Sequence, residues 1–302
     1  MKLAVLNPKG SDPAQSFAEG AGVPGGQGHP PVGAQGFAAC TGGALFRRDQ
    51  DVPAEQKEVL VLLETNWKAC RQAIMELRSE GKTVAIAWKD AGPLQIAEQL
   101  AKPAALQLFQ EICQRADGGI ATTPDLVPFF TAAGVRHTEF IPTPFPVEEA
   151  AWDLSTPLEE RRGIFVGTRD FRTPSRNHLA ALLAVRQLAA SMFEAVTVIN
   201  DHGWRGRGML AKLGYDERLL KVVEGPLPYA KYLRLLAKHK IVWQLDASAG
   251  PGQVAGDALL AGGAVCGRQW DDGAAGLRRC VRAGARCGTA FRSRGAAAGA
   301  SA

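Results

Sequence analysis

The fold of the second half of this chain is decided by residues 162–169, which read RGIFVGTR. The apolar centre of this stretch predicts a buried strand, and Gly167 predicts a tight turn where the strand ends. A helical pattern begins soon afterwards, at Ser175-Arg176-Asn177. A helix N-terminus beside arginine side chains favours the binding of a phosphate group. The alternative is an ordinary strand–helix unit whose arginines are only solvated.

A proline-rich segment, residues 142–157, separates this strand from the elements before it. The alternation of strands and helices restarts after the segment, as the start of a second domain would. The length of 302 residues also fits two domains. We therefore expect one domain over residues 1–150, a second over residues 151–263, and an irregular basic tail over residues 264–302.

Short apolar runs alternate with helical patterns through the first domain. Residues 8–43 interrupt this alternation, because they are rich in glycine, proline and alanine and predict a long loop, with disorder as the alternative. Thr123 and Pro124 are typical of the N-cap and first position of a helix. The expected strands are 3–6, 58–63, 83–88, 119–122 and 138–141, and the expected helices are 67–80, 94–116 (broken at Lys102-Pro103) and 123–134.

The second domain repeats the same pattern. Near-continuous apolar strands that alternate with helices predict parallel sheets covered on both faces. Two such sheets would face a cleft, with ligands beyond the carboxyl ends of the strands. The fold class is thus α/β with two Rossmann-like domains. The expected strands are 164–167, 196–199, 220–223 and 241–245, and the expected helices are 175–191, 206–213, 228–238 and 252–260.

The composition excludes several classes of protein. With 46% hydrophobic and 22% charged residues the chain is globular and not disordered. The formal net charge of +5 comes from the tail, where seven arginines and two aspartates between residues 268 and 294 give 7 − 2 = 5. The rest of the chain is near neutral, so that no nucleic-acid partner is expected.

The six cysteines are scattered and form no C-x-x-C pair, which argues against a metal site and favours a reducing compartment. The N-terminal apolar run ends at Pro8 and is too short for a signal peptide. No run reaches the roughly 20 apolar residues of a membrane span. A cytoplasmic location is expected.

Three stretches together resemble the GT-B glycosyltransferases, specifically the retaining group that uses a nucleotide-sugar donor. Residues 121–144 are similar to the end of that family's N-terminal domain. Residues 165–177 are similar to the first strand and helix of its donor domain, and residues 223–263 to a later run of that domain. The resemblance implies the GT-B fold, with a second domain that is incomplete in this chain.

The resemblance also implies a donor site that needs no metal and no cofactor, with the nucleotide sugar as substrate. Arg169, Arg176 and Asn177 would hold the diphosphate, whose negative charge grows as the nucleotide leaves. Asp257 would accept hydrogen bonds from ribose hydroxyls, and Tyr229 would flank the base. The alternative for each is a surface charge or a core aromatic residue.

Residues that follow strands of the first domain are candidates for the acceptor side of the cleft. They are Lys9, Gly10, His29, Lys89 and Asp90. The acceptor itself is open, and a sugar, a lipid and a protein are all compatible with the sequence. Peripheral contact with a membrane is a further expectation.

Two departures from the family pattern bear on activity. The family has an acidic pair, two glutamates separated by seven residues, and its second member matches Asp257 while its first falls on Ala249. No catalytic residue is therefore assigned. The α/β pattern ends after Gly263, and residues 264–302 predict no strand and no capped helix. One choice of codons for residues 266–281, read one base later, encodes a glycine-rich loop and a helix.

A reading-frame shift near residue 265 would explain this tail, and a natural disordered basic tail is the alternative. We expect the chain as written to be a weak or inactive enzyme. The leading interpretation is a hexosyltransferase-like glycosyltransferase that moves a sugar from a nucleotide-sugar donor to an unknown acceptor. The competing interpretations are a non-catalytic two-domain protein that binds a sugar or nucleotide, and a nucleotide-sugar epimerase, which shares the fold.

Overall fold

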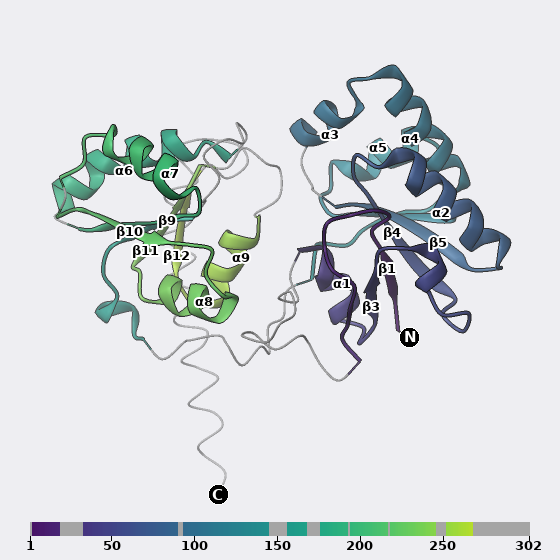
Figure 1. Cartoon of the computed structure of the whole chain (residues 1–302), viewed down its shortest axis with the longest axis horizontal. Coiled ribbons are helices and arrows are strands. Elements are labelled where there is room, and N and C mark those ends of the chain that lie inside the picture. Colours follow the sequence, from purple (N-terminus) through teal and green to yellow (C-terminus); the bar gives the residue numbers. More distant parts are fainter. Residues whose placement is uncertain are drawn as a thin grey trace, which may run out of the picture. The chain divides into compact units, whose positions relative to one another are not determined.

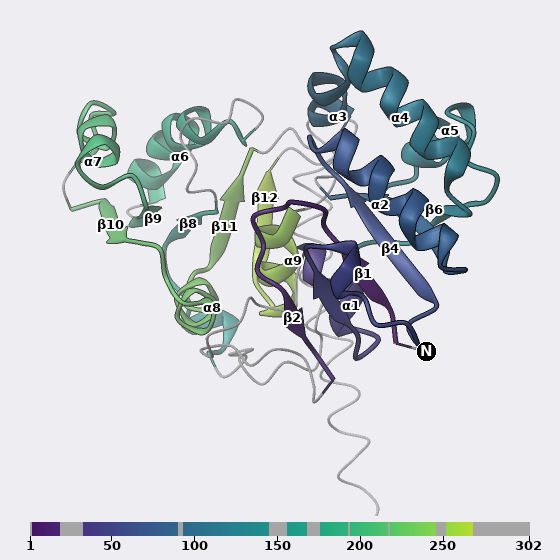
Figure 2. The ribbon, with the colours of Figure 1, turned by 45° about the vertical axis from the view of Figure 1, so that its right-hand side comes forward.

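The computed structural model describes residues 2–18, 33–89, 93–144, 156–167, 176–192, 194–216, 218–245 and 252–267. The chain divides into two compact units, one within residues 1–149 and one within residues 150–302. Each unit has its own sheet and its own helices (Figure 1, Figure 2). The expected α/β fold with two parallel sheets is confirmed.

The first unit is built on a seven-stranded sheet. Its strands are β1 (Ala4–Leu6), β2 (Gln15–Ser16), β3 (Ala44–Phe46), β4 (Glu58–Leu63), β5 (Thr83–Trp88), β6 (Gly118–Ala121) and β7 (Thr138–Phe140). Their order is β2-β3-β1-β4-β5-β6-β7, and all neighbours are parallel except β2, which runs antiparallel to β3. The central strands are nearly continuous apolar runs because both of their faces are buried.

Helices cover both faces of this sheet (Figure 1). They are α1 (Gly36–Ala39), α2 (Trp67–Ser79), α3 (Pro93–Leu100), α4 (Pro103–Arg115) and α5 (Leu126–Ala132), with short 3-10 helices at Gly33–Gln35 and Asp49–Asp51. Val61 of β4 packs with α2, α4 and α5, whereas its neighbour Leu60 packs with Phe37 and Ala38 of α1. Consecutive strand residues point to opposite faces, so each strand contributes to both cores.

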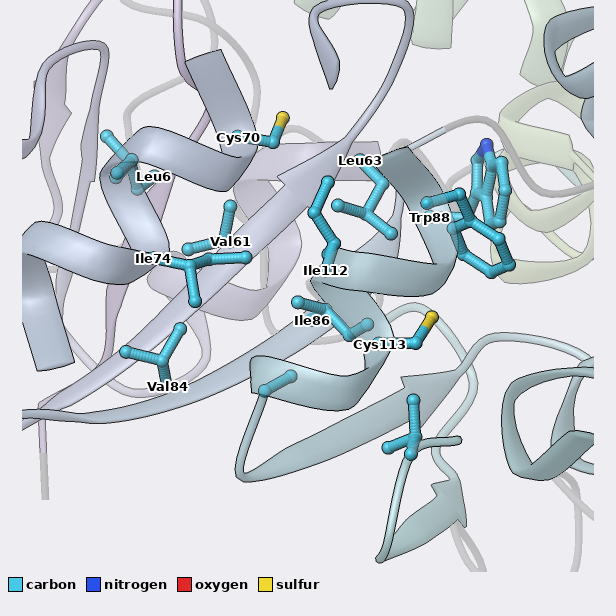
Figure 3. Packing of buried hydrophobic residues seen from close by; sticks show 14 of the residues in the cluster. Leu6, Val61, Leu63, Cys70, Ile74, Val84, Ile86, Trp88, Ile112 and Cys113 are labelled. Carbon is cyan, nitrogen blue, oxygen red and sulfur yellow. The ribbon is translucent and has the colours of Figure 1, made fainter. Parts of the chain in front are cut away.

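The core beneath α2 and α4 continues to the carboxyl end of β5. Figure 3 shows Ile74, Ile86 and Ile112 in the layer between these two helices and the sheet. Trp88, the last residue of β5, contacts Phe109 at 5.0 Å between ring centroids, and its Nε1 donates a hydrogen bond of 2.9 Å to Gln99 of α3. Buried aromatic contacts of this kind fix the position at which β5 ends.

The second unit is built on a five-stranded parallel sheet with the order β10-β9-β8-β11-β12. Its strands are β8 (Ile164–Val166), β9 (Val196–Asn200), β10 (Leu220–Glu224), β11 (Ile241–Gln244) and β12 (Ala264–Gly267). Helices α6 (His178–Met192) and α7 (Gly203–Ala211) cover one face, and α8 (Tyr229–Ala237) and α9 (Gly252–Leu260) cover the other (Figure 2). A 3-10 helix at Leu158–Glu160 precedes β8.

The expectation of no strand after Gly263 is wrong. Residues 264–267 form β12, which pairs with β11 so that Val265 lies opposite Val242. This strand is too short and too poor in large apolar residues to be recognised from its pattern, and it is defined by hydrogen bonds to a neighbour about twenty residues away. The rest of the expected tail, residues 268–302, lies outside the described residues.

Two expectations for the first unit are also wrong. Residues 8–43 are not a single loop, because they include β2 and α1, and the three-residue strand β3 that follows them is missing from the expected elements. Thr123 is not the N-cap of α5. The Thr123 and Pro124 carbonyls accept hydrogen bonds from Leu126 and Val127, which makes this segment a turn, and Asp125 occupies the N-cap position without a side-chain cap hydrogen bond.

His239, in the turn before β11, is a buried polar residue of the second core and is 7% exposed. Its Nδ1 lies 2.8 Å from the carbonyl oxygen of Leu235, and its Nε2 lies 2.8 Å from the hydroxyl of Thr197. Burial lowers the pKa of His239 below its ordinary value, which outweighs the opposing hydrogen bond to Leu235. The neutral ring therefore donates from Nδ1 to the carbonyl and accepts from Thr197 at Nε2.

We expect His239 to make the stability of the second unit depend on pH. The unfolded chain binds a proton on this histidine at a higher pH than the folded chain does, so the free energy of unfolding falls as the pH drops below the ordinary pKa of histidine. Urea unfolding at pH 7.5 and pH 5.0 should show the wild type losing more stability than His239→Gln. An equal loss in both proteins would contradict the assignment.

Candidate functional site

The strand order of the second sheet reverses beside β8. The chain leaves β8 for β9 on one side and later returns to β11 on the other. In open parallel sheets the crevice at such a switch point, beyond the carboxyl ends of the strands, is the usual position of a ligand. The residues that end β8 and β11, and those that begin α6 and α9, therefore form the candidate donor site.

Gly167 brings the backbone of this site close to α9. It directly follows β8, and its N–H donates a hydrogen bond of 3.0 Å to the carbonyl of Trp243. A Cβ atom on Gly167 would lie 2.4 Å from Cγ1 of Val254 in α9. A side chain at this position would therefore displace Val254, and the predicted turn after Gly167 lies outside the described residues.

Asn177 joins the start of α6 to the end of β11. Its side-chain Nδ2 donates a hydrogen bond of 2.9 Å to the carbonyl of Leu245, and its own carbonyl accepts one of 2.8 Å from Ala181. The backbone of Asn177 has a φ of 47°, a conformation in which asparagine is enriched. Arg176 is half-buried beside it. Both residues thus lie at the switch point, whereas Arg169 lies outside the described residues.

Tyr229 and Asp257, the other two expected donor residues, contact each other. The Tyr229 hydroxyl, in the first turn of α8, donates a hydrogen bond of 2.9 Å to Oδ1 of Asp257 in α9. Asp257 is fully buried, and its Oδ1 is engaged by the Tyr229 hydroxyl in this arrangement. A contact with ribose would require this cover to move. The geometry supports a bond that holds α8 against α9, and the ribose role stays a prediction.

The first sheet also has a switch point, because β1 has β3 on one side and β4 on the other. Two of the expected acceptor residues, Lys9 and Gly10, lie in the turn that follows β1. A Cβ atom on Gly10 would lie 2.0 Å from Nδ2 of Asn7, so the turn can fold over the buried Asn7 only because residue 10 is glycine. Lys9 has a φ of 57°, and its carbonyl accepts a hydrogen bond of 3.4 Å from Asn66.

Lys89, a third expected acceptor residue, is held by two carboxylates at the same edge. Its Nζ lies 2.8 Å from Oδ2 of Asp12 and 3.3 Å from Oε2 of Glu64, and Asn7 donates a hydrogen bond of 3.1 Å to Asp12. Burial by itself would lower the pKa of Lys89, but the hydrogen bonds and charges of Asp12 and Glu64 outweigh it and raise the pKa. Lys89 is therefore a fixed cation and not a base.

The structure thus brings Lys9, Gly10 and Lys89 to one edge, while His29 and Asp90 lie outside the described residues. Sequence reasoning missed Asp12 and Glu64. Glu64 directly follows the last residue of β4, and this position after a buried strand was the available signal. Asp12 lay in the residues read as a long loop, and only the folded turn after β1 places it against Lys89.

Among the described residues, no group of three or more histidine, cysteine, aspartate or glutamate side chains is arranged to hold a metal ion. Within the same residues, no helix combines the length and the apolar character needed to cross a membrane.

The sequence matches no protein-family model and no curated protein sequence. Solved structures do share its fold of two Rossmann-like units. The apo structure of OtsA matches with a TM-score of 0.56 and 14% sequence identity, over 88% of this chain and 84% of that chain. The chain has the GT-B fold.

Two further GT-B structures match at similar levels. One is a UDP-forming α,α-trehalose-phosphate synthase from Burkholderia xenovorans, with a TM-score of 0.53 and 11% identity over 88% of this chain and 84% of that chain. The other is a trehalose-6-phosphate structure from E. coli bound with UDP-2-fluoro glucose, with a TM-score of 0.53 and 15% identity over 69% of this chain. The match spans 58% of that second chain. Identities this low establish the GT-B fold alone.

We expect Lys89→Met to destabilise the first unit. The change leaves Asp12 and Glu64 close together without their shared cation, and hydrogen bonds to charged groups are worth about 1.5–3 kcal/mol each. The free energy of unfolding should fall by about 1–3 kcal/mol in urea titrations. Lys68→Met, an exposed lysine of α2, is the matched control and should change it by less than about 0.5 kcal/mol. Equal effects of the two changes would show that the cluster carries no stability.

We expect Tyr229→Phe to loosen the contact between α8 and α9. The change removes a hydrogen bond to a buried carboxylate, which should lower the free energy of unfolding by about 1–3 kcal/mol. Tyr215→Phe is the matched comparison, because the Tyr215 hydroxyl bonds to the neutral carbonyl of Leu182 and its loss should cost less. Thermal or urea unfolding of both variants checks the order. A Tyr229→Phe protein as stable as the wild type would mean that the bond is absent in solution.

Proposed function

We propose that this protein transfers a glycosyl group from a nucleotide-sugar donor to a hydroxyl group of an acceptor. The observation that carries the proposal is the presence of polar side chains at the point of strand-order reversal in both sheets of one GT-B chain. Charged or amide side chains lie at the carboxyl edge of each of the two sheets, beside the strand at which the strand order reverses. A protein that only needed a stable α/β core would not require polar residues at these two positions.

The second unit is suited to the donor. Arg176 and Asn177 lie at the N-terminus of α6, a helix of fifteen residues, where the helix dipole and free backbone N–H groups attract an anion. Gly167 leaves room for Val254 of α9 at the end of β8. The matching E. coli structure is bound with UDP-2-fluoro glucose, which supports a nucleotide sugar as the ligand of this edge.

The first unit is suited to an acceptor with hydroxyl groups. Lys9 and Lys89 balance the charges of Asp12 and Glu64, so this edge has a formal net charge of zero and offers no excess positive charge to a phosphate group. The two carboxylates accept hydrogen bonds, and hydroxyl groups donate them. Of the three acceptor classes compatible with the sequence, this cluster favours a sugar.

The chemistry of the transfer assigns a clear task to the donor site. The bond between the anomeric carbon and the phosphate oxygen breaks, and its electron pair leaves with the nucleoside diphosphate. The acceptor oxygen forms the new bond to the anomeric carbon, and its proton passes to the departing diphosphate or to water. Arg169 and Arg176 would stabilise the charge that develops on the diphosphate. This task needs neither a cofactor nor a metal ion in addition to the arginines.

Binding of a nucleotide sugar without transfer is the second candidate. Ala249 in place of the family's first acidic residue and the burial of Asp257 both favour it. Enzymatic release of free nucleotide from the donor would distinguish a transferase from a binding protein. An epimerase would instead convert the sugar while it stays on the nucleotide.

The proposal is tested by calorimetric titration with UDP, ADP and GDP and with their glucose conjugates. We expect one of these series to bind, and Arg176→Ala to weaken it by about 10- to 100-fold, because charged hydrogen bonds contribute about 1.5–3 kcal/mol. Arg218→Ala is the control, since its side chain is 92% exposed and lies in the same unit. Failure of every series to bind, or equal binding by Arg176→Ala and the wild type, would overturn the donor site.

A further inference from the structure

Gln244, the last residue of β11, has a buried side-chain oxygen, Oε1, to which no described residue donates a hydrogen bond. The residue is 9% exposed, and its Oε1 atom accepts no hydrogen bond within the part of the chain that the structure describes. A buried carbonyl oxygen that has lost its water and gained no donor is unfavourable, so that such groups usually have a partner. Other buried polar atoms of the described residues share this condition, Nε1 of the adjacent Trp243 among them, so a ligand as the missing partner is inferred for Gln244 only together with its position.

The place of Gln244 supports this reading. Its Oε1 lies 3.5 Å from the position that a Cβ atom on Gly167 would occupy, and Val254 of α9 borders the same position. Gln244 therefore lies at the switch point between β8 and β11, on the face of the sheet that α9 covers. This is the edge assigned above to the nucleotide sugar, and the inference rests on that proposed function.

Other side-chain amides at the carboxyl edge of the same sheet are engaged by the protein. Asn177 donates to the carbonyl of Leu245, as described above. Asn200, the last residue of β9, donates a hydrogen bond of 2.9 Å to the carbonyl of Gly203 and accepts one of 3.1 Å from the N–H of His202. These asparagines shape the turns that follow the strands. Gln244 makes no such contact among the described residues.

The chemistry of the unpaired atom limits what it can bind. A carbonyl oxygen accepts hydrogen bonds and cannot bind a phosphate oxygen, which is also an acceptor. The groups of a nucleotide sugar that donate beside its diphosphate are the hydroxyls of the ribose and of the transferred sugar. We propose that Gln244 recognises the donor through a hydrogen bond from one of these hydroxyl groups to its Oε1 atom, and is thus a specificity-determining residue of the donor site.

The test compares Gln244→Met with the wild type, because methionine keeps the length of glutamine and removes its amide. Affinities for UDP and for UDP-glucose, or for the pair that the wild type prefers, are measured by calorimetric titration, and Tm by thermal unfolding. We expect about tenfold weaker binding, as for the loss of one hydrogen bond. Tm should stay equal or rise. The loss of an amide that stabilises the fold would lower Tm, whereas the loss of an amide whose oxygen has no partner would not. Gln187→Met, an exposed glutamine of α6, is the control for the substitution itself.

The two ligands identify the hydroxyl. Weaker binding of both UDP and UDP-glucose assigns it to the ribose, and weaker binding of UDP-glucose alone assigns it to the transferred sugar. Unchanged affinity for both, or a Tm well below that of the wild type, overturns the role of Gln244 and leaves the proposed function standing. A wild type that binds no nucleotide or nucleotide sugar overturns the proposed function and this inference with it.

Discussion

The reversal of strand order beside β1 and beside β8 is the constraint on which the rest of this structure depends. Parallel strands need crossover connections, and these are almost always right-handed. Crossovers that leave a central strand in opposite directions therefore cover opposite faces of the sheet. The carboxyl ends at that point remain without a crossing segment. Among the described residues of both units, the polar side chains discussed here lie at the carboxyl ends of β1, β4, β5 and β11 or at the start of α6, on the edge where the strand order reverses.

The packing below each edge holds these side chains in place. In the first unit the aromatic contacts of Trp88 fix the end of β5, and Lys89 is the next residue. In the second unit Asn200 plays a similar part, because its amide bonds to Gly203 and His202 set the turn into α7, and a Cβ atom on Gly206 would lie 1.8 Å from its Oδ1. Sites are precise when they stand on rigid elements, and both edges meet this condition.

The two edges differ in charge, and this difference is why the proposed function assigns the acceptor to the first unit and the donor to the second. At the first edge Lys89 is surrounded by two carboxylates, and the excess of acceptor atoms suits hydroxyl groups. At the second edge Arg176 lies at the N-terminus of a long helix, and the excess of positive potential suits a diphosphate. The pairing of Tyr229 with Asp257 shows that one acidic residue expected to bind ribose is engaged within the protein. Gln244 is then the polar group of this edge that a donor hydroxyl can satisfy.

The sequence by itself determined the repeated strands and helices, the two domains and the GT-B resemblance, because these follow from apolar periodicity and from glycine and proline positions along a continuous stretch. It also placed Lys9, Gly10, Lys89, Arg176 and Asn177 after strands, where an α/β sheet collects its ligand-binding residues. Only the tertiary structure decided that Asp12 and Glu64 hold Lys89, that Tyr229 covers Asp257, that β12 pairs with β11, and that no described residue donates to the buried Oε1 of Gln244. Each of these is a property of contacts between segments far apart in the chain. No local pattern of residues specifies which distant atom will form a hydrogen bond with a given side chain, or whether any will.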